Sequence, residues 1–405
     1  MRFLLLNQFY PPDPAPTGQY LHDLAQVLVA RGHEVQVFCS RRSYDGMNVY
    51  PKSETLAGVE VVRLLATGFG RRGFAGKLAD YGSFYGSLLF ALLFGRKSPD
   101  LILSLTTPPY IGLLGKLAAR RHACLHADWV MDLYPDVMFA HGLARKEGLL
   151  FRTLEKLSRF QLRYSQPIIA LGATMAERVG KYVAPASAPA PVAWLPLWSG
   201  ADLSPWPVGQ RNPLREERGW AATDVVFLYS GNMGLGHRFT EFLTAAGALA
   251  GRGLRWAFCG SGKRRAEIET FAQQHPAARI ELLNYAPQQR LREHLCAADV
   301  HLLSLDEAWQ GYMVPSKLQA SFAVGRPVIY VGGRNCETAT WIETSGGGWI
   351  VPPNDLPGLQ AAIQAALDPE ERSRRGAAAR QFAAQHFDRT ANCHRLAQLL
   401  ETPNP

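Results

Sequence analysis

A chain of 405 residues with 47% hydrophobic and 19% charged residues has the composition of a globular protein, and its length favours two domains. Its net charge of +9 lies in the first half: residues 1–200 hold 22 Lys and Arg against 14 Asp and Glu, and residues 201–405 hold 21 against 20. The excess indicates one basic surface that faces a polyanion. Because no nucleic-acid-binding motif accompanies this charge, we expect anionic lipid and not nucleic acid.

The sequence predicts neither a membrane-spanning helix nor a disulfide framework. No run reaches the roughly 18 apolar residues that a spanning helix needs. The first ten residues read as a buried strand and not as a signal peptide, because a proline-rich loop follows them directly. The six cysteines are scattered without CxxC spacing, which predicts reduced thiols in a cytoplasmic protein.

Apolar runs alternate with helical patterns along the first half of the chain. A helix is predicted at 18–31, and a Pro- and Ala-rich stretch at 184–213 reads as the connection between domains. Continuous apolar strands separated by helices predict a parallel, doubly wound sheet. The predicted strands are 2–8, 34–39, 101–105, 167–171 and 192–197.

The second half repeats this alternation. Helices are predicted at 239–250 and 263–275. The chain is therefore expected to form two α/β sheets in tandem, with the ligand at the carboxyl ends of the strands. The predicted strands are 225–230, 256–259, 280–283, 300–304, 327–331 and 348–351.

Several residues of the second half suit a diphosphate. They follow apolar strands or open helices, where glycines permit close backbone approach and free N–H groups attract anions. An ordinary structural role also fits each segment: a capped helix with an exposed lysine, a solvated first helical turn, or a plain turn. These candidates are Gly231, Asn232, Gly234, His237, Arg238, Gly260, Gly262, Lys263, Tyr285, Ser316, Lys317 and Gln319.

In the first half, a proline-stiffened loop places Thr17 and Gly18 at the start of a helix, as further donor-site candidates. The segment 126–136 holds the densest group of ionisable and aromatic residues. Its His126, Asp128 and Asp132 are candidates for orienting an acceptor hydroxyl or acting as general base. Metal binding by aspartates spaced four apart, or plain caps and loop hydrogen bonds, are the alternatives.

Two segments account for the basic half. Residues 69–97 surround the apolar run 88–94 with Lys and Arg, as in a helix that lies in a membrane interface or is buried. A helix over 147–164 places four cations on one face, which also fits an ordinary amphipathic surface helix. Those cations are Arg152, Lys156, Arg159 and Arg163.

Together these segments resemble retaining glycosyltransferases of the GT-B fold in family four, and more narrowly the WbuB-like bacterial enzymes of cell-surface polysaccharide synthesis. The matching pieces span residues 1 to about 352. They are LNQFYPP with Thr17-Gly18, RGHEVQVF, WVMDLYPDV, YSGNMGLGHR, CGSGK, ADVHLL and VPSKLQASFAVGRPVIYVGG.

The resemblance implies two Rossmann-like domains, at 1–202 for the acceptor and 203–385 for the donor, with a C-terminal helix in 386–405 crossing back to the first. It further implies transfer from a nucleotide sugar, expected to be UDP-linked, to a lipid-linked saccharide. No metal or cofactor is expected, and the protein is expected at the inner face of the cytoplasmic membrane. Lys317, Arg238 and Lys263 would then balance the charge on the leaving diphosphate.

One departure from the family pattern is clear. The two glutamates that many members carry eight positions apart fall at Tyr312 and Ala320 here, and neither is acidic. A sugar-nucleotide epimerase and a non-catalytic carbohydrate- or lipid-binding scaffold therefore remain alternatives. A dehydrogenase is disfavoured, because no GxGxxG with a downstream acid follows the first strand.

Overall fold

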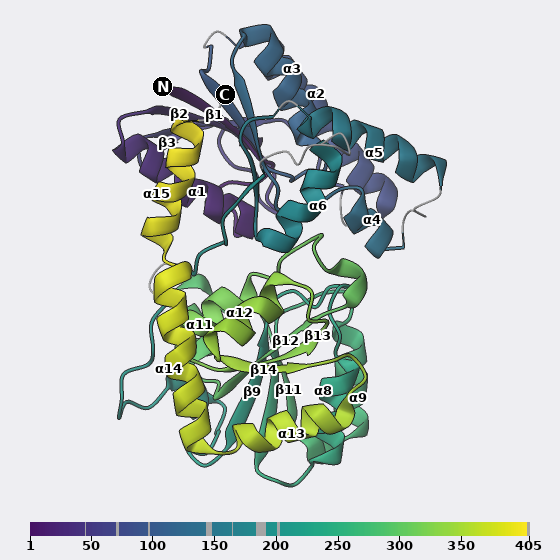
Figure 1. Cartoon of the computed structure of the whole chain (residues 1–405), viewed down its shortest axis with the longest axis vertical. Coiled ribbons are helices and arrows are strands. Elements are labelled where there is room, and N and C mark those ends of the chain that lie inside the picture. The colour runs from purple at the N-terminus through teal and green to yellow at the C-terminus, as the bar shows by residue number, and fades with distance from the viewer. Residues whose placement is uncertain are drawn as a thin grey trace. The chain divides into compact units, whose positions relative to one another are not determined.

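The computed structural model describes residues 1–44, 46–69, 73–95, 98–142, 148–163, 165–183, 192–200 and 203–402. The chain forms two compact units, shown in Figure 1. The first comprises residues 1–196 together with the chain from Thr390, and the second comprises Leu197–Arg389. The sequence-based borders were placed after residues 202 and 385.

An eight-stranded sheet forms the centre of the first unit, in the order β3-β4-β2-β1-β5-β6-β7-β8. Neighbouring strands are parallel except β3 and β4, which pair antiparallel. The strands are β1 (Arg2–Leu6), β2 (Glu34–Ser40), β3 (Ser53–Leu56), β4 (Val59–Leu64), β5 (Leu101–Ser104), β6 (Leu125–Trp129), β7 (Ile168–Ala170) and β8 (Ala193–Trp194).

The expected parallel, doubly wound sheet is thus confirmed, although β3, β4 and β6, which contains the polar His126 and Asp128, were not among the predicted strands. β3 is a polar strand at the edge of the sheet, and β4 alternates buried with half-buried residues. Neither β3 nor β4 therefore has the continuous apolar run by which strands such as β1 and β5 were recognised. The predicted strand 192–197 is only two residues long.

The helices α2 and α3 cover one face of this sheet. Phe84, Leu88 and Leu92 of α2 pack with Ile111 and Ala118 of α3 against strand residues of the same core. The helices of the first unit are α1 (Pro16–Ala30), α2 (Phe74–Phe94), α3 (Ile111–His122), α4 (Asp136–Ala140), α5 (Leu149–Leu162), α6 (Ala173–Val183) and α15 (Arg389–Glu401).

The last helix, α15, belongs to the first unit although it ends the chain. Its Glu401 accepts a hydrogen bond of 2.5 Å from the Arg31 guanidinium at the end of α1. The His33 ring lies 2.7 Å from the other oxygen of the same carboxylate. These side chains fix the end of α15 to the turn between α1 and β2.

A six-stranded parallel sheet forms the second unit, in the order β11-β10-β9-β12-β13-β14. In chain order this is 3-2-1-4-5-6, the dinucleotide-fold order, whose switch point lies between β9 and β12. The first unit repeats this order from β4 to β7 and adds one strand at each edge. The strands are β9 (Val225–Ser230), β10 (Leu254–Cys259), β11 (Ile280–Leu283), β12 (Val300–Leu305), β13 (Val328–Gly332) and β14 (Gly348–Val351).

Helices flank this second sheet, and the predicted helices 239–250 and 263–275 are confirmed as α8 and α9. The longer helices are α8 (Thr240–Ala248), α9 (Arg265–Gln274), α12 (Glu337–Ser345), α13 (Leu356–Ala366) and α14 (Pro369–His386). The shorter ones are α7 (Pro213–Glu217), α10 (Leu291–Cys296), α11 (Lys317–Ala323) and the 3₁₀ turns at 276–278, 288–290 and 307–309.

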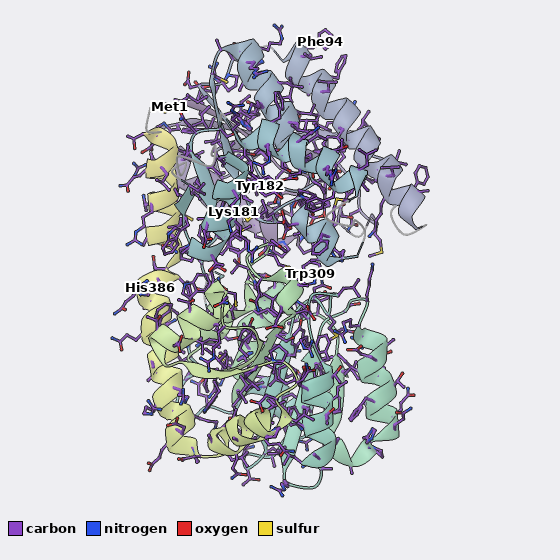
Figure 2. The ribbon with its side chains drawn as sticks, turned by 45° about the vertical axis from the view of Figure 1, so that its right-hand side comes forward. Met1, Phe94, Lys181, Tyr182, Trp309 and His386 are labelled. Carbon is purple, nitrogen blue, oxygen red and sulfur yellow. The ribbon has the colours of Figure 1, made fainter. Side chains whose placement is uncertain are left out.

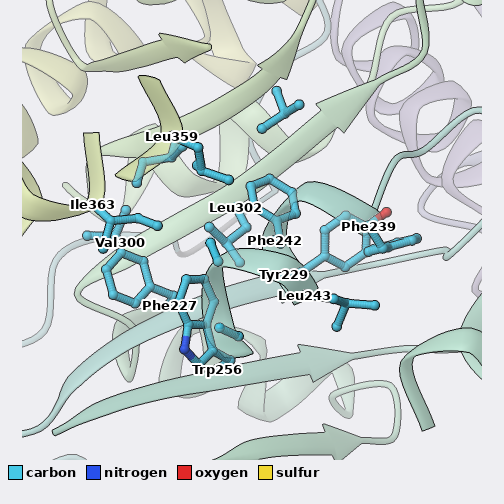
Figure 3. Packing of buried hydrophobic residues seen from close by; sticks show 14 of the residues in the cluster. Phe227, Tyr229, Phe239, Phe242, Leu243, Trp256, Val300, Leu302, Leu359 and Ile363 are labelled. Atoms are coloured by element: carbon cyan, nitrogen blue, oxygen red, sulfur yellow. The ribbon is translucent and has the colours of Figure 1, made fainter. Parts of the chain in front are cut away.

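Aromatic packing fixes the strand that precedes the candidate site. Phe227 of β9 and Trp256 of β10 are cross-strand neighbours whose rings stack at 4.7 Å, and Figure 3 shows both in the core. Tyr229, two residues further along β9, packs edge-on against Phe239 at the start of α8. Buried aromatic side chains bury some 150–250 Å² each, so the end of β9 is held firmly.

Candidate functional site

Lys317 lies at the switch point of the second unit. Its ammonium stands 5.1 Å from the centre of the Tyr229 ring on β9 and 2.9 Å from Nε2 of His237. Its side chain passes over Gly231, where an added Cβ would come within 2.7 Å of the Lys317 Cε. Gly231 also has a φ of +133°. Glycine is therefore required there both by the backbone and by the lysine.

The hydrogen bonds of His237 determine its tautomer. Its Nδ1 lies 2.7 Å from the carbonyl oxygen of Ser304 at the end of β12. Because a carbonyl oxygen only accepts, Nδ1 carries the proton and the Nε2 lone pair faces Lys317. Burial, followed by the Lys317 charge, lowers the pKa of His237 to about 3. A neutral imidazole therefore accepts a hydrogen bond from the Lys317 ammonium.

Lys317 is a cation without a counter-ion of its own. Across the described ranges of the chain, no carboxylate forms an ion pair with it. Burial against protein atoms lowers the pKa of Lys317 to about 7. An anion placed beside this group would favour its protonated form, so the geometry suits a phosphate.

Arg238 is arranged differently from Lys317. Its guanidinium donates to Glu241 at 2.8 Å, to Asp306 at 3.3 Å and to Asn354 at 2.9 Å. Its backbone N–H donates to the Ser304 hydroxyl at 2.9 Å. Because the guanidinium is already paired with carboxylates, its role is to join the loop after β9 to the segments that carry Glu241, Asp306 and Asn354.

Two glycine loops, after β9 and after β10, are held against each other by their backbones. The Gly231 N–H donates to Cys259 and the Met233 N–H to Ser261, each at 2.8 Å. Gly260 and Gly262 have φ values of +133° and +147°. A Cβ on Gly260 would lie 2.2 Å from the Gly231 oxygen, and one on Gly262 would lie 2.5 Å from the Met233 oxygen. The glycines thus permit this close approach.

The remaining candidates of the second unit are partly exposed around these loops. Asn232 and Lys263 are exposed, and Gly234 and Ser316 are half-buried. Tyr285 is 55% exposed, with its hydroxyl 3.3 Å from the Ser261 oxygen. Ser316 precedes the seven-residue helix α11, and its hydroxyl makes no capping hydrogen bond there.

Two buried amides of the second unit, those of Gln319 and Gln310, have atoms without hydrogen-bond partners among the residues that the structure describes. Neither side-chain amide atom of Gln319, which is fully buried, has a partner. The Nε2 of Gln310 is likewise unsatisfied, and it lies where a Cβ on Gly333 would be 1.9 Å away. Each such group costs about 1–3 kcal/mol. Gln310 was not predicted, although the Gly332-Gly333 pair beside it was part of the recognised pattern.

In the first unit, His126 and Asp128 lie inside the fold, beneath α3. The His126 ring is 3.0 Å from the Ser104 hydroxyl at Nε2 and 2.8 Å from the Ser165 hydroxyl at Nδ1. Asp128, which is fully buried, accepts a hydrogen bond of 2.7 Å from Gln161 of α5. Burial lowers the pKa of His126. These contacts give both predicted catalytic candidates interior, structural surroundings.

Glycines bring α3 onto these two side chains. A Cβ on Gly115 would lie 2.3 Å from the Ser104 hydroxyl, and one on Gly112 would lie 2.5 Å from the Asp128 carboxylate. The helix therefore covers this face of β5 and β6 without a gap.

Asp132, by contrast, follows β6 at the carboxyl edge of the sheet and is half-buried. Burial raises the pKa of Asp132 to about 6. Its backbone N–H donates to the Thr106 hydroxyl, after β5, at 3.0 Å. Its carboxylate could accept a hydrogen bond from a ligand hydroxyl.

Thr17 belongs to the same edge, where its hydroxyl accepts a hydrogen bond of 3.3 Å from Asn7 at the end of β1. A Cβ on Gly18 would lie 2.8 Å from the Phe9 oxygen, so Gly18 lets α1 begin directly against that loop. The Oδ1 of Asn7 is buried and unsatisfied within the described part of the chain.

The three aspartates spaced four apart do not converge. Asp128 is interior, Asp132 is at the sheet edge, and Asp136 accepts a hydrogen bond from the Tyr182 hydroxyl. Over the described ranges, no group of three or more His, Cys, Asp or Glu side chains is arranged to hold a metal ion. The alternative of an aspartate metal site is therefore unsupported by the side-chain arrangement.

Comparison with protein families gives a match over most of the chain. Residues 17–198 match the model of a glycosyl transferase 4-like domain, and residues 224–369 match that of the glycosyl transferases group 1. Among curated proteins, the chain is 26% identical over 268 residues to a Pseudomonas aeruginosa protein named as the glycosyltransferase WbjE. This alignment covers 65% of each chain.

A second relative matches nearly end to end. Escherichia coli (strain K12) WcaI, named as a colanic acid biosynthesis glycosyl transferase, is 26% identical over 407 residues, covering 96% of this chain and 97% of the relative.

Solved structures share the fold. Sucrose-phosphate synthase of Thermosynechococcus elongatus superposes with a TM-score of 0.78 at 18% identity, covering 99% of this chain and 98% of the other. Anabaena HepE in complex with UDP-glucose superposes with a TM-score of 0.72 at 14% identity, covering 99% and 100%.

Proposed function

Because the chain belongs to the group 1 glycosyltransferases and has the GT-B fold, we propose that it transfers a sugar from a UDP-sugar to a lipid-linked saccharide. The transfer retains the anomeric configuration and needs no metal ion. The product is part of a cell-surface polysaccharide, and the protein works as a peripheral protein at the inner face of the cytoplasmic membrane. The relatives named for polysaccharide synthesis support this proposal.

The observation that carries the proposal is the ammonium of Lys317 at the switch point of the second sheet, which forms no ion pair with a carboxylate of the described residues. As the bond between sugar and diphosphate breaks, negative charge develops on the leaving diphosphate. A cation already fixed there, in surroundings poor in water, stabilises that charge without rearranging. The solved UDP and UDP-glucose complexes of HepE, which has this fold, support a uridine nucleotide as donor.

Other residues position the donor or this cation. His237, neutral and hydrogen-bonded to β12, holds the ammonium of Lys317 over Tyr229. The exposed Lys263, on the neighbouring glycine loop, supplies a second positive charge. The exposed ring of Tyr285 offers a face to the base.

For the acceptor, we assign the orienting carboxylate to Asp132. Of the three predicted catalytic residues, only Asp132 lies at the carboxyl edge of its sheet, where it is half-buried. Its pKa is also raised by burial. Its ionised form accepts the hydrogen bond of the attacking hydroxyl. His126 and Asp128 support it from within, through the hydrogen bonds that hold β5, β6 and α5 together.

The test is acceptor-dependent release of the donor's nucleoside diphosphate by the purified protein, screened with UDP-, GDP-, ADP- and TDP-sugars and lipid-linked saccharides. Lys317→Ala should reduce transfer about 100-fold or more, as the loss of a charge-stabilising group does, with the fold intact. Lys181→Ala, which removes an exposed lysine of the first unit, is the matched control and should change nothing.

Unchanged turnover of Lys317→Ala at saturating donor would remove Lys317 from the mechanism. Conversion of the sugar nucleotide into an isomer without acceptor would instead establish an epimerase, and neither reaction with any donor would leave a binding scaffold. The anomeric configuration of the product, read by NMR coupling constants, tests retention.

A further inference from the structure

We infer that α2, α3 and α5 of the first unit form one surface that docks onto an anionic membrane. This inference deepens the proposed function, on which it rests for a lipid-linked acceptor, by naming the part of the protein that meets the lipid. The three helices are neighbours, since α3 packs against both α2 and α5.

The helix α2 is apolar on both of its sides. Its inner side packs on the sheet through Phe84, Leu88 and Leu92. Its outer side carries large apolar side chains, among which Phe90 is 65% and Phe94 is 68% exposed. Figure 2 shows Phe94 at the end of this helix, directed away from the body of the unit. The exposed stripe consists of Ala75, Leu78, Ala79, Gly82, Gly86, Leu89, Phe90, Leu93 and Phe94.

An outer face of this kind has no counterpart in an ordinary surface helix, which presents polar residues to water. The helix has 21 residues and is therefore about 30 Å long. None of the helices in the described ranges is long and apolar enough to cross a membrane. Because its inner side is anchored on the sheet, α2 would lie along a membrane surface and not through it.

The neighbouring helices continue this apolar surface. At the end of α3, the Arg121 guanidinium donates to the Leu93 carbonyl of α2 at 3.4 Å. On the side of α3 that faces α5, the Arg120 guanidinium lies over the ring of Phe160 of α5, 5.3 Å from the ring centre. The exposed large apolar side chains of α3 and α5 are Leu117, Leu149, Leu150, Leu157 and Phe160.

Beneath the end of α2 lies a mainly apolar hollow of about 410 Å³. Phe90 and Phe94 line it together with Leu4, Phe38 and Val62 of the sheet, and its polar lining residues are Gln36, Glu60 and His122. The hollow adds apolar surface to that of the helices at the point where the two phenylalanines project.

The charge of the surface indicates the partner. Seven Lys and Arg side chains on these helices, including the residue that ends α5, are exposed. By contrast, their two acidic side chains, Asp80 and Glu155, are half-buried; Asp80 accepts a hydrogen bond from Thr67, and Glu155 pairs with Arg159 and so balances one of the seven charges. Cations around an apolar face favour the negatively charged surface of a membrane containing anionic lipids. The exposed cations are Lys77, Arg120, Arg121, Arg152, Lys156, Arg159 and Arg163.

The experiment is flotation of the purified full chain with lipid vesicles, without nucleotide. Vesicles of phosphatidylcholine alone are compared with vesicles that contain phosphatidylglycerol. We expect binding that requires phosphatidylglycerol and weakens as the salt concentration rises, since salt screens charges outside the protein.

The double variant Phe90→Gln/Phe94→Gln should lower the partition coefficient about tenfold or more, because both side chains are exposed and would insert into lipid. Val208→Gln, which changes a fully exposed apolar residue of the second unit, is its control and should not alter binding. Arg120→Gln/Arg121→Gln should weaken the dependence on phosphatidylglycerol, whereas Arg252→Gln, an exposed cation of the second unit, should not.

Binding that is equal with and without phosphatidylglycerol, or unchanged in the phenylalanine variant, would overturn the inference. A concentration-dependent dimer without vesicle binding, lost in the same variant, would assign the surface to a second copy of the chain. Vesicle binding with no sugar transfer would refute the proposed function and leave the docking surface standing. An unchanged circular dichroism spectrum and an unchanged urea midpoint of the first unit would show that the variants are folded.

Discussion

Binding of a UDP-sugar should draw a proton onto Lys317. The free protein holds this ammonium at a pKa of about 7 because burial disfavours its charge. A diphosphate within about 4–6 Å favours the charged form and should raise the pKa by roughly two units. Proton uptake per donor bound would then be about 0.1 at pH 6, about 0.5 at pH 7 and about 0.8 at pH 8.

Other groups contribute little to this uptake at pH 8. His237, with a pKa of about 3, is neutral throughout, and Asp132, with a pKa of about 6, is ionised in both states. A UDP-sugar is a better probe than UDP, because its diphosphate lacks the terminal phosphate that titrates at a pKa of about 6.

The assay is isothermal titration calorimetry with UDP-glucose in buffers of different ionisation enthalpy, where the slope of observed against buffer enthalpy gives the protons taken up. Uptake should increase from pH 6 to pH 8, vanish in Lys317→Arg, whose guanidinium is always charged, and persist in Lys181→Arg. Binding without uptake at pH 8 in the native protein would refute the reasoning that a desolvated Lys317 meets the diphosphate.

Three further outcomes are expected. Asp132→Asn should lower kcat/KM about 100-fold and abolish a fall in activity below about pH 6; a wild-type pH–rate profile that is flat from pH 5 to 8 would contradict its role. Gly231→Ala should destabilise the second unit by about 1–3 kcal/mol and weaken UDP binding, because residue 231 has a φ of +133° and the added Cβ would contact Lys317. Urea unfolding measures the loss of stability, and calorimetry measures the loss of affinity. Gly82→Ala, whose added Cβ would lie in open space, is the control for both measurements. Glu401→Gln should cost about 1 kcal/mol at neutral pH. The hydrogen bond from Arg31 lowers the pKa of Glu401 to about 2, so this stabilisation is present above about pH 4.5 and is lost as the pH falls towards 2. Equal urea midpoints for the native protein and Glu401→Gln at pH 7 would show that Glu401 contributes no such stabilisation.

The alternation of apolar strands with helices was sufficient to predict the parallel, doubly wound sheets. Buried parallel strands must be apolar on both faces, so each leaves a continuous run in the sequence. The glycines after β9 and β10 could be placed at one edge for a related reason: the carboxyl ends of parallel strands meet there. The sequence could not place the partly polar β3 and β4, whose pattern depends on their position near an edge.

The sequence by itself thus determined the family, the parallel, doubly wound fold class, and the loops that hold the candidate site. Only the tertiary structure decided which residues within those loops are available. His126 and Asp128 stand two positions apart on one strand, yet only the packing of α3 through Gly112 and Gly115 shows that both are enclosed. Lys317 and His237 are 80 residues apart, yet burial and the Lys317 charge together keep His237 neutral, so that its ring can accept a hydrogen bond from the ammonium. The physical reason is that desolvation and hydrogen bonding depend on neighbours in space, which spacing along the chain does not specify.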